Sequence, residues 1–347
     1  MDPVTSGVTR AAVWTGDGVD VRTVDLPQPG GPDALVRVRL ATVCASDRHT
    51  AAGHRAAPCP SVLGHEAVGE VVWPGAHRRL AVGDRVVWSV TSACGHCRRC
   101  QDGRTAKCNV VRKVGHEPFE GEWPLSGGYA EHIVLPVGVT VERVPDGLID
   151  AVAAPAACAT ATVMASLEAA GAVAGRRVLL SGAGMLGVTA AAAFSEAGAQ
   201  VWITDIDPLR VQTAERFGAV ADPGGPIDVA VDFTGATAAV GAALGRLDIG
   251  GVLVLAGSVS PGPTVPVDPE TVVRRWLTIT GVHNYEPRHL RQGVAFLNRT
   301  RAVHPWPDLV ADPVPLDELD AVLRAVPGAT LRAAIAPRLA SSGSRTH

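Results

Sequence analysis

The pattern of hydrophobic and polar residues changes character near the middle of the chain. Between residues 11 and about 143, short segments alternate apolar and polar positions in part, as in ALVRVRLATVC (34–44), AVGEVVWPG (67–75) and GDRVVWSV (83–90). Such alternation is typical of half-buried strands, and the Gly, Pro and Asp residues between the segments mark turns. This part is therefore predicted to form an all-β barrel or sandwich.

Beyond Pro155, continuous apolar segments alternate with helical patterns. RRVLLSGAG (176–184) leads into an alanine-rich helix at 185–198, and AQVWITDID (199–207) leads into a helix that starts near Pro208. Strands that alternate with helices predict a parallel, doubly wound sheet. Three more strands are predicted: IDVAVDFTGA (227–236), GGVLVLAGS (250–258) and LTITGV (277–282). After Pro287 we predict a helix at about 288–298, an amphipathic segment at 316–325, a strand at 331–337 and a disordered tail, SSGSRTH.

The composition is that of an ordinary globular protein. Of the 347 residues, 47% are hydrophobic and 19% are charged, and the net charge of −3 gives no argument for a nucleic-acid or membrane partner. The length allows two domains, or one large domain with a well-buried core. The most apolar long segment, 151–175, contains Pro155 and Glu168, and the N-terminal MDPVTSGVTRAAVW has no basic stretch followed by an apolar run. We therefore expect no membrane span, no secretory signal and a cytoplasmic location.

Four of the seven cysteines form a C-x2-C-x2-C-x7-C cluster at Cys94, Cys97, Cys100 and Cys108. In a reducing cytoplasm, clustered cysteines indicate a metal site rather than disulfides. Four thiolates complete the tetrahedral coordination of a structural zinc ion and leave no position for a substrate. An iron–sulfur cluster is the alternative, but the ferredoxin pattern differs in its last spacing and its proline. We predict structural zinc here, and Cys59 is an additional thiol without an assigned role.

A glycine-rich turn follows the first predicted strand of the second half. GAGMLG supplies Gly182, Gly184 and Gly187 in the G-x-G-x-x-G spacing, between a buried strand and a helix whose N-terminus can receive a pyrophosphate. Asp205 ends the next strand, where a carboxylate binds the ribose hydroxyls and repels a 2′-phosphate. NAD is therefore favoured over NADP, although Arg210 lies near enough in sequence to serve a phosphate. The alternative is a structural turn that binds no nucleotide.

Two further motifs, CASDRH (44–49) and GHE (64–66), complete a resemblance that covers nearly the whole chain. Together with the cysteine cluster and the nucleotide fold, they resemble the medium-chain zinc-dependent alcohol dehydrogenase family. The resemblance implies an α/β and β fold class, with a GroES-like β catalytic domain and a doubly wound Rossmann domain. The catalytic domain would comprise residues 1–158, with 287–347 returning to it, and the NAD-binding domain residues 159–286.

The resemblance also implies a catalytic zinc ion bound by Cys44, His65 and Cys158. Two thiolates and one imidazole leave a fourth position open, as catalytic zinc requires, so two zinc ions per chain are expected. The other implied roles are Glu66 beside the metal, Asp47 orienting the histidine, Ser46 and His49 in a proton relay, and Thr162 against the nicotinamide. The plainer alternatives are a turn residue for Ser46 and a surface histidine for His49. Zinc would acidify a bound alcohol, which would then pass a hydride to NAD.

The substrate is expected to be a small alcohol or carbonyl compound. KVGHE (113–117) and APAACATATVMASLE (154–168) resemble a subgroup associated with phosphonate metabolism, which would make the substrate a hydroxyalkylphosphonate. Lys113, His116 and Arg48 would then bind its head group through charge-assisted hydrogen bonds, unless Lys113 and His116 only shape the loop. A polyol or amino-alcohol dehydrogenase is the alternative within the family.

Two alternatives belong to other classes of protein. A non-catalytic zinc- and nucleotide-binding protein would lack the open zinc position, and a metal-free quinone reductase relative would lack the zinc ligands. The intact ligand set argues against both. The resemblance further implies a homodimer or homotetramer, in which LTITGV (277–282) is the candidate edge strand at the subunit interface.

Overall fold

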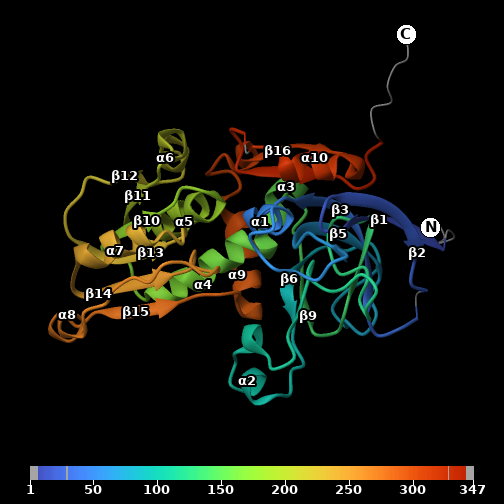
Figure 1. Ribbon diagram of the computed structural model, residues 1–347, viewed down its shortest axis with the longest axis horizontal. Helices are drawn as coiled ribbons and strands as arrows, with labels where there is room; N and C mark the ends of the chain where they lie inside the picture. Colours follow the sequence, from blue (N-terminus) through green and yellow to red (C-terminus); the bar gives the residue numbers. More distant parts are fainter. Residues whose placement is uncertain (1–6, 29, 327, 341–347) are drawn as a thin grey trace, which may run out of the picture. The chain divides into compact units, whose positions relative to one another are not determined.

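The chain forms two compact units (Figure 1), seen in a computed structural model that describes residues 7–28, 30–326 and 328–340. The tail predicted to be disordered, 341–347, and the first six residues of the chain lie outside the described residues. The first unit extends to Cys158 and resumes at Trp306, and the second unit is Ala159–Pro305.

The strands of the first unit pair antiparallel, in line with its alternating sequence, except for β16 and β17, which pair in parallel. Its larger sheet has the order β16-β17-β3-β5-β6-β7, with β8 paired to β3 and β9 to β6, and a second sheet has the order β2-β1-β4. The strands are β1 Val8–Trp14, β2 Val19–Asp25, β3 Ala34–Thr42, β4 Ser61–Val62, β5 Glu66–Trp73, β6 Arg85–Ser92, β7 Arg112–Lys113, β8 His132–Leu135, β9 Val139–Arg143, β16 Val310–Val314 and β17 Arg332–Ile335. Trp88, Tyr129 and Ile133 are fully buried between them.

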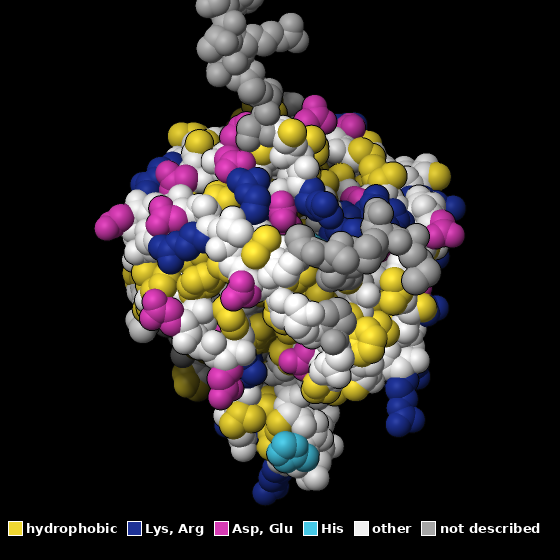
Figure 2. Space-filling model, turned by 90° about the vertical axis from the view of Figure 1, so that its right-hand side faces the viewer, with side chains coloured by type: hydrophobic (Ala, Val, Ile, Leu, Met, Phe, Trp, Pro, Cys, Tyr) yellow, Lys and Arg dark blue, Asp and Glu magenta, His cyan; other side chains and the backbone are white. Residues whose placement is uncertain are grey.

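Short helices connect these strands. They are α1 Ala45–Ala51, α2 Arg98–Gln101, α3 Asp150–Ala153 and α10 Leu319–Arg324, with 3-10 turns at Thr105–Lys107, Ala154–Ala157, Trp306–Leu309 and Leu316–Glu318. The segment that carries α2 projects from the strands of this unit (Figure 1). Figure 2 shows basic and acidic side chains interspersed on one face of the molecule, as the small net charge leads one to expect.

The second unit contains the predicted parallel sheet, and its strand order, β12-β11-β10-β13-β14-β15, is that of a Rossmann fold. The strands are β10 Arg177–Ser181, β11 Gln200–Thr204, β12 Val220–Ala221, β13 Ile227–Asp232, β14 Leu247–Leu255 and β15 Thr278–Gly281. The helices are α4 Ala159–Ala170, α5 Met185–Glu196, α6 Pro208–Glu215, α7 Thr237–Arg246, α8 Pro269–Arg274 and α9 Pro287–Thr300. Among the described residues, no single helix is long and apolar enough to span a membrane, and only Asp150–Ala157 and Ala159–Ala170 taken together, with a bend between them, have that length and composition.

The predicted return to the first domain at residue 287 is wrong. Helix α9 remains in the second unit, which continues to Pro305. The reason is packing: a Cβ on Gly293 would lie 3.3 Å from Cγ2 of Thr160 in α4. In addition, both Arg288 and His289 hydrogen-bond to the carboxylate of Glu168 at the end of α4. These contacts join residues more than a hundred positions apart, which the local pattern did not indicate.

Candidate metal centres and nucleotide-binding site

Cys44, His65 and Cys158 converge in the first unit, although they are far apart in the sequence. One ligand atom from each lies within 4.8 Å of the others. Cys44 follows β3 and is the N-terminal cap of α1, His65 directly precedes β5, and Cys158 ends the 3-10 turn at Ala154–Ala157. Tetrahedral zinc with Zn–S bonds of about 2.3 Å places neighbouring sulfur ligands about 3.8 Å apart, so the three donors fit a zinc ion.

The pKa values of the two cysteines of this centre are shifted in opposite directions. A hydrogen bond from the Cys158 thiol lowers the pKa of Cys44 well below its ordinary value, and the positive charge of Arg332 acts in the same direction against desolvation. The same hydrogen bond, together with burial, raises the pKa of Cys158. The environment of Cys44 therefore favours the thiolate form, which is the form that binds zinc.

Asp47 lies beside the His65 ring. Its Oδ1 lies 3.3 Å from His65 Nδ1, which leaves Nε2 as the candidate ligand atom. Burial alone would raise the pKa of Asp47, but the adjacent His65 ring lowers it overall. The other carboxylate oxygen accepts hydrogen bonds from the backbone N–H of Cys44 (3.0 Å) and the hydroxyl of Tyr129 (2.9 Å). Ser46 Oγ lies 3.3 Å from His65 Nε2, so the structure brings this predicted residue to the centre as well.

Tyr129 is a residue of this network that sequence reasoning missed. It is fully buried, and its hydroxyl also lies 3.3 Å from the carbonyl oxygen of Thr42. Backbone hydrogen bonds from Gly128 to Gly64 and from Tyr129 to Leu63 hold it beside the GHE motif. The motif SGGYAEH contains this tyrosine, but nothing in the sequence indicates that its partner is Asp47.

Glu66 forms an ion pair with Arg332, the second residue that sequence reasoning missed. The Arg332 guanidinium donates to both carboxylate oxygens, at 2.7 and 2.9 Å, and the Thr42 hydroxyl donates to one of them at 2.8 Å. Both charged side chains are buried. Burial raises the pKa of Glu66 in spite of Arg332. Because Arg332 Nη2 also lies 3.7 Å from Cys44 Sγ, the guanidinium stabilises negative charge on both neighbours.

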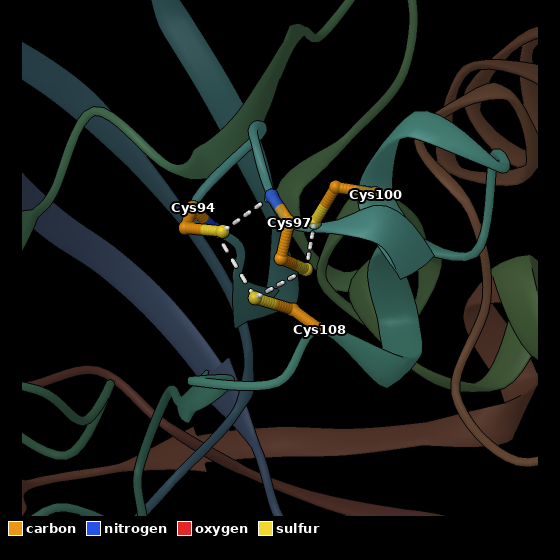
Figure 3. A group of neighbouring side chains, drawn as sticks. All are labelled: Cys94, Cys97, Cys100 and Cys108. Carbon is orange, nitrogen blue, oxygen red and sulfur yellow. Dashed lines mark hydrogen bonds between the residues drawn. The ribbon is translucent and has the colours of Figure 1, made fainter.

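The four clustered cysteines form a second donor group around α2. Their sulfur atoms point toward one another (Figure 3) and lie within 4.8 Å, with Cys97 Sγ 3.5 Å from Cys100 Sγ and 4.0 Å from Cys108 Sγ. These distances match those between ligands of tetrahedral zinc. Backbone N–H groups, first that of Asn109, lower the pKa of Cys97 to about 6, whereas burial raises that of Cys100 to about 12. A cation is needed to hold all four as thiolates, because neighbouring negative charges oppose ionisation.

The predicted site residues His116, Arg48 and His49 lie in three different surroundings. His116 lies at the metal centre, with its ring centroid 5.8 Å from that of His65. Arg48 does not carry a free guanidinium, because its Nη1 donates to the carbonyl oxygens of Leu323 and Ala325. His49 is exposed, and its ring lies 5.9 Å from that of His54.

The glycine-rich turn of the second unit has the conformation that the motif requires. Gly182 has φ +97°, and a Cβ on Gly187 would lie 1.8 Å from the Gly182 carbonyl oxygen, so the close approach of helix to strand needs glycine at both positions. Gly184 is the N-terminal cap of α5, which leaves the first N–H groups of the helix for a ligand. The backbone N–H of Ala183 donates to Asp205 Oδ2 at 2.6 Å. Nε of Arg210 lies 3.6 Å from Oδ2 of Asp207. Thr162, in α4, is half-buried.

Known proteins are similar to this chain in sequence and in architecture. Residues 30–146 match the alcohol dehydrogenase GroES-like domain. L-threonine 3-dehydrogenase of Edwardsiella ictaluri (strain 93-146) is 32% identical over 78% of this chain and 82% of its own length. This chain belongs to the medium-chain zinc-dependent alcohol dehydrogenase family. It is an NAD(P)-dependent zinc dehydrogenase with the predicted GroES-like and Rossmann folds.

Solved structures of other dehydrogenases agree with this membership. An alcohol dehydrogenase of Thermotoga maritima is 25% identical, with a TM-score of 0.86 over 95% of this chain and 100% of its own. A Sinorhizobium meliloti 1021 protein assigned as a zinc-binding dehydrogenase and bound to NADP is 25% identical, with a TM-score of 0.85 over 96% and 100%. The family and the fold class predicted from the sequence are thereby confirmed for this dehydrogenase.

Proposed function

We propose that this dehydrogenase catalyses the reversible oxidation of a small alcohol to its carbonyl compound, with zinc bound by Cys44, His65 and Cys158 and with NAD as the hydride acceptor. The observation that carries the proposal is the convergence of these three donor atoms within 4.8 Å. Three protein ligands leave the open position that a catalytic zinc ion needs, whereas the four-cysteine group is closed. When bound, zinc supplies Lewis-acid chemistry and NAD supplies the hydride acceptor.

The surrounding side chains have separate roles in this proposal. Asp47 and Tyr129 keep the Nε2 atom of His65 turned toward the sulfur atoms, because they fix the carboxylate that contacts Nδ1. Arg332 holds Glu66 by a bidentate ion pair, so that this carboxylate does not take the open position. In this proposal Ser46, 3.3 Å from His65 Nε2, would accept the proton of the alcohol, and the exposed His49 would pass it to solvent.

The test of the proposal is turnover together with metal content. We expect about two zinc ions per chain, as the two donor groups indicate, and oxidation of a panel of alcohols with NAD. Metal content is measured by mass spectrometry and turnover by NADH absorbance. One zinc ion per chain would remove one of the two metal centres, and an absence of turnover on every alcohol and carbonyl compound would refute the enzymatic proposal.

Asp205 is proposed to select NAD. Its carboxylate accepts one backbone hydrogen bond at each oxygen, from Ala183 and Asp207, and so is held beside the glycine-rich turn. A negative charge there repels a 2′-phosphate. The Sinorhizobium neighbour is bound to NADP, so the family fold alone does not fix the preference.

Replacing Asp205 with asparagine is expected to lower the ratio of kcat/KM for NAD to that for NADP by about tenfold or more, since about 1.4 kcal/mol corresponds to a factor of ten. The amide keeps one hydrogen-bond acceptor and removes the charge. Asp207→Asn is the matched control, because Asp207 caps α6 through the N–H of Leu209. Steady-state kinetics with both cofactors check the prediction, and an unchanged ratio in Asp205→Asn contradicts it.

The substrate class is a separate part of the proposal. The KVGHE segment and its resemblance to the phosphonate-associated subgroup support a hydroxyalkylphosphonate. An amino alcohol is the second candidate, because several relatives, including that of Edwardsiella ictaluri, are L-threonine 3-dehydrogenases. Comparing 2-hydroxyethylphosphonate with L-threonine as substrates distinguishes the two candidates.

Assembly and location are further parts of the proposal. Strand β15 ends the parallel sheet and is largely exposed, which supports pairing of this edge in a homodimer or homotetramer. We also propose a cytoplasmic location, without a nucleic-acid or membrane partner, on the composition and the small net charge.

A further inference from the structure

Helix α1 carries several of the residues that surround the metal centre, but it is only seven residues long. A helix of this length is not stable by itself, so tertiary contacts must hold it. At its N-terminal end, the N–H of Cys44 donates to Asp47 Oδ2 at 3.0 Å, and Asp47 Oδ1 lies 3.3 Å from His65 Nδ1. A separate contact holds the last turn of the helix, which carries His49.

Arg48 makes this contact, with the end of helix α10. Its Nη1 donates to the carbonyl oxygen of Leu323 at 3.3 Å and to that of Ala325 at 2.5 Å. Leu323 lies in the last turn of α10, and Ala325 is its C-terminal cap. The last carbonyl groups of a helix have no partner within the helix and carry a partial negative charge, so a guanidinium stabilises this end of α10. Among the described residues, no carboxylate forms an ion pair with Arg48.

Helix α10 is itself fixed to the N-terminal strands of the first unit. Leu323 is buried in the apolar core of this unit. Arg324 donates to the carbonyl oxygen of Asp17, in the turn between β1 and β2. Just before α10, a carboxylate oxygen of Asp317 lies 2.5 Å from Nη2 of Arg10 in β1. Helix α10 is therefore an anchored support, and the Arg48 guanidinium joins α1 to it.

Arg48 and Ser46 use different sides of α1. Residues two positions apart on an α-helix do not face each other. Ser46 is on the side of the metal centre, where its Oγ lies 3.3 Å from His65 Nε2. Arg48 instead contacts α10. These contacts suit Arg48 to holding the helix rather than to binding the head group of a substrate, which is the role predicted for it from the sequence.

We infer that Arg48 is a positioning residue, which caps α10 and thereby holds the last turn of α1, so that His49 stays where proton transfer from Ser46 to solvent requires it. The inference rests on the proposed function and adds to it a residue that contacts neither zinc nor substrate. A displacement of about 1 Å can lower the rate of a catalysed step about a hundredfold, so loss of the contact should slow turnover. Cys44 and His65 keep their own contacts to Asp47, so both metal centres should keep their zinc.

The first test measures the contact without turnover. The backbone N–H groups of residues 52–55 donate to carbonyl oxygens of the last turn of α1, so their hydrogen exchange reports whether this turn is held. In zinc-loaded Arg48→Met, these groups are expected to exchange about tenfold or more faster than in the unaltered protein, because hydrogen bonds to a charged group are lost. Arg99→Met is the matched control, because Arg99 also donates to a backbone carbonyl oxygen, that of Lys107 at 3.0 Å, but in the segment 94–108. Unchanged exchange at 52–55 in Arg48→Met overturns the inference.

The second test separates positioning from substrate binding. In Arg48→Met, kcat is expected to fall about tenfold or more, by the same factor for 1-propanol and for 2-hydroxyethylphosphonate, with KM and zinc content unchanged. Arg48→Lys, which can still donate to the carbonyl groups of α10, should recover most of the loss. A rise in KM confined to the phosphonate would show that Arg48 binds the head group and would overturn the inference, as would an unchanged kcat. If the unaltered protein oxidises no alcohol at all, the proposed function itself fails.

Discussion

Replacing Cys158 with alanine is expected to abolish turnover and to leave the first unit folded. The substitution removes one of three donor atoms, and a site with two protein ligands holds zinc poorly. Changes to groups that only support a ligand cost 10- to 100-fold in metal affinity or activity, so loss of a ligand should lower kcat by more than about a hundredfold. Cys158 is only partly buried, at the end of a short turn, so the thermal midpoint should change by less than about 4 °C.

The matched control is Cys59→Ala. Cys59 is exposed and belongs to neither group of candidate metal ligands. This variant should keep two zinc ions and full turnover, whereas Cys158→Ala should keep one zinc ion. Zinc content, kcat and a circular-dichroism melting curve are measured on all three proteins. Turnover by Cys158→Ala at more than a tenth of the original rate would exclude Cys158 as a ligand of the catalytic metal.

The sequence indicated those parts of the site that depend on local spacing. The four clustered cysteines lie within 15 residues, and their grouping follows from one short helix and a turn. The glycine-rich turn is likewise a local feature, since the close approach of Gly187 to Gly182 is fixed by the strand–turn–helix geometry. The convergence of Cys44, His65 and Cys158 did not follow from spacing, and only the resemblance to a known family predicted it.

The buried partners of the centre could not be predicted, because they depend on strand pairing over long distances in the sequence. Arg332 reaches Glu66 across 266 residues only because β17 pairs with β3, which in turn pairs with β5. Tyr129 reaches Asp47 across 82 residues through the hydrogen bonds of a loop. Periodicity predicts that such residues are buried, but it does not identify the polar group that each of them meets.

The contacts of charged residues such as Arg48 and Arg55 could not be predicted from the sequence either. The sequence analysis predicts Arg48, on α1, as a substrate-binding residue and assigns no role to Arg55, just after that helix. In the fold, the end of α10 supplies two carbonyl groups to Arg48, whereas Arg55 has no such partner among the described residues. The carbonyl groups that Arg48 contacts belong to a segment more than 270 residues further along the chain, so the sequence around Arg48 does not indicate them.

Replacing Cys100 with serine is expected to cost stability rather than chemistry. The segment 94–108 contains one helix of four residues and a 3-10 turn of three, and its buried residues are Cys100, Ala106 and Cys108. So little apolar burial cannot order a loop of this length, and the binding of a structural zinc ion contributes its folding free energy directly. The variant should lose one zinc ion per chain, and its thermal midpoint should fall by about 4 °C or more.

Limited trypsin digestion locates this loss within the molecule. The segment 94–108 contains four trypsin cleavage sites, at Arg98, Arg99, Arg104 and Lys107. If this segment unfolds without its metal, trypsin should cut it there, whereas the metal-bound segment should resist cleavage. Cys158→Ala should resist trypsin at these bonds as the unaltered protein does, although it also has one zinc ion. The two variants thus separate a closed, structural centre from an open, catalytic one. Loss of one zinc ion with unchanged trypsin resistance in Cys100→Ser would show that the segment is ordered without metal, and retention of two zinc ions would show that Cys100 is not needed to hold the metal.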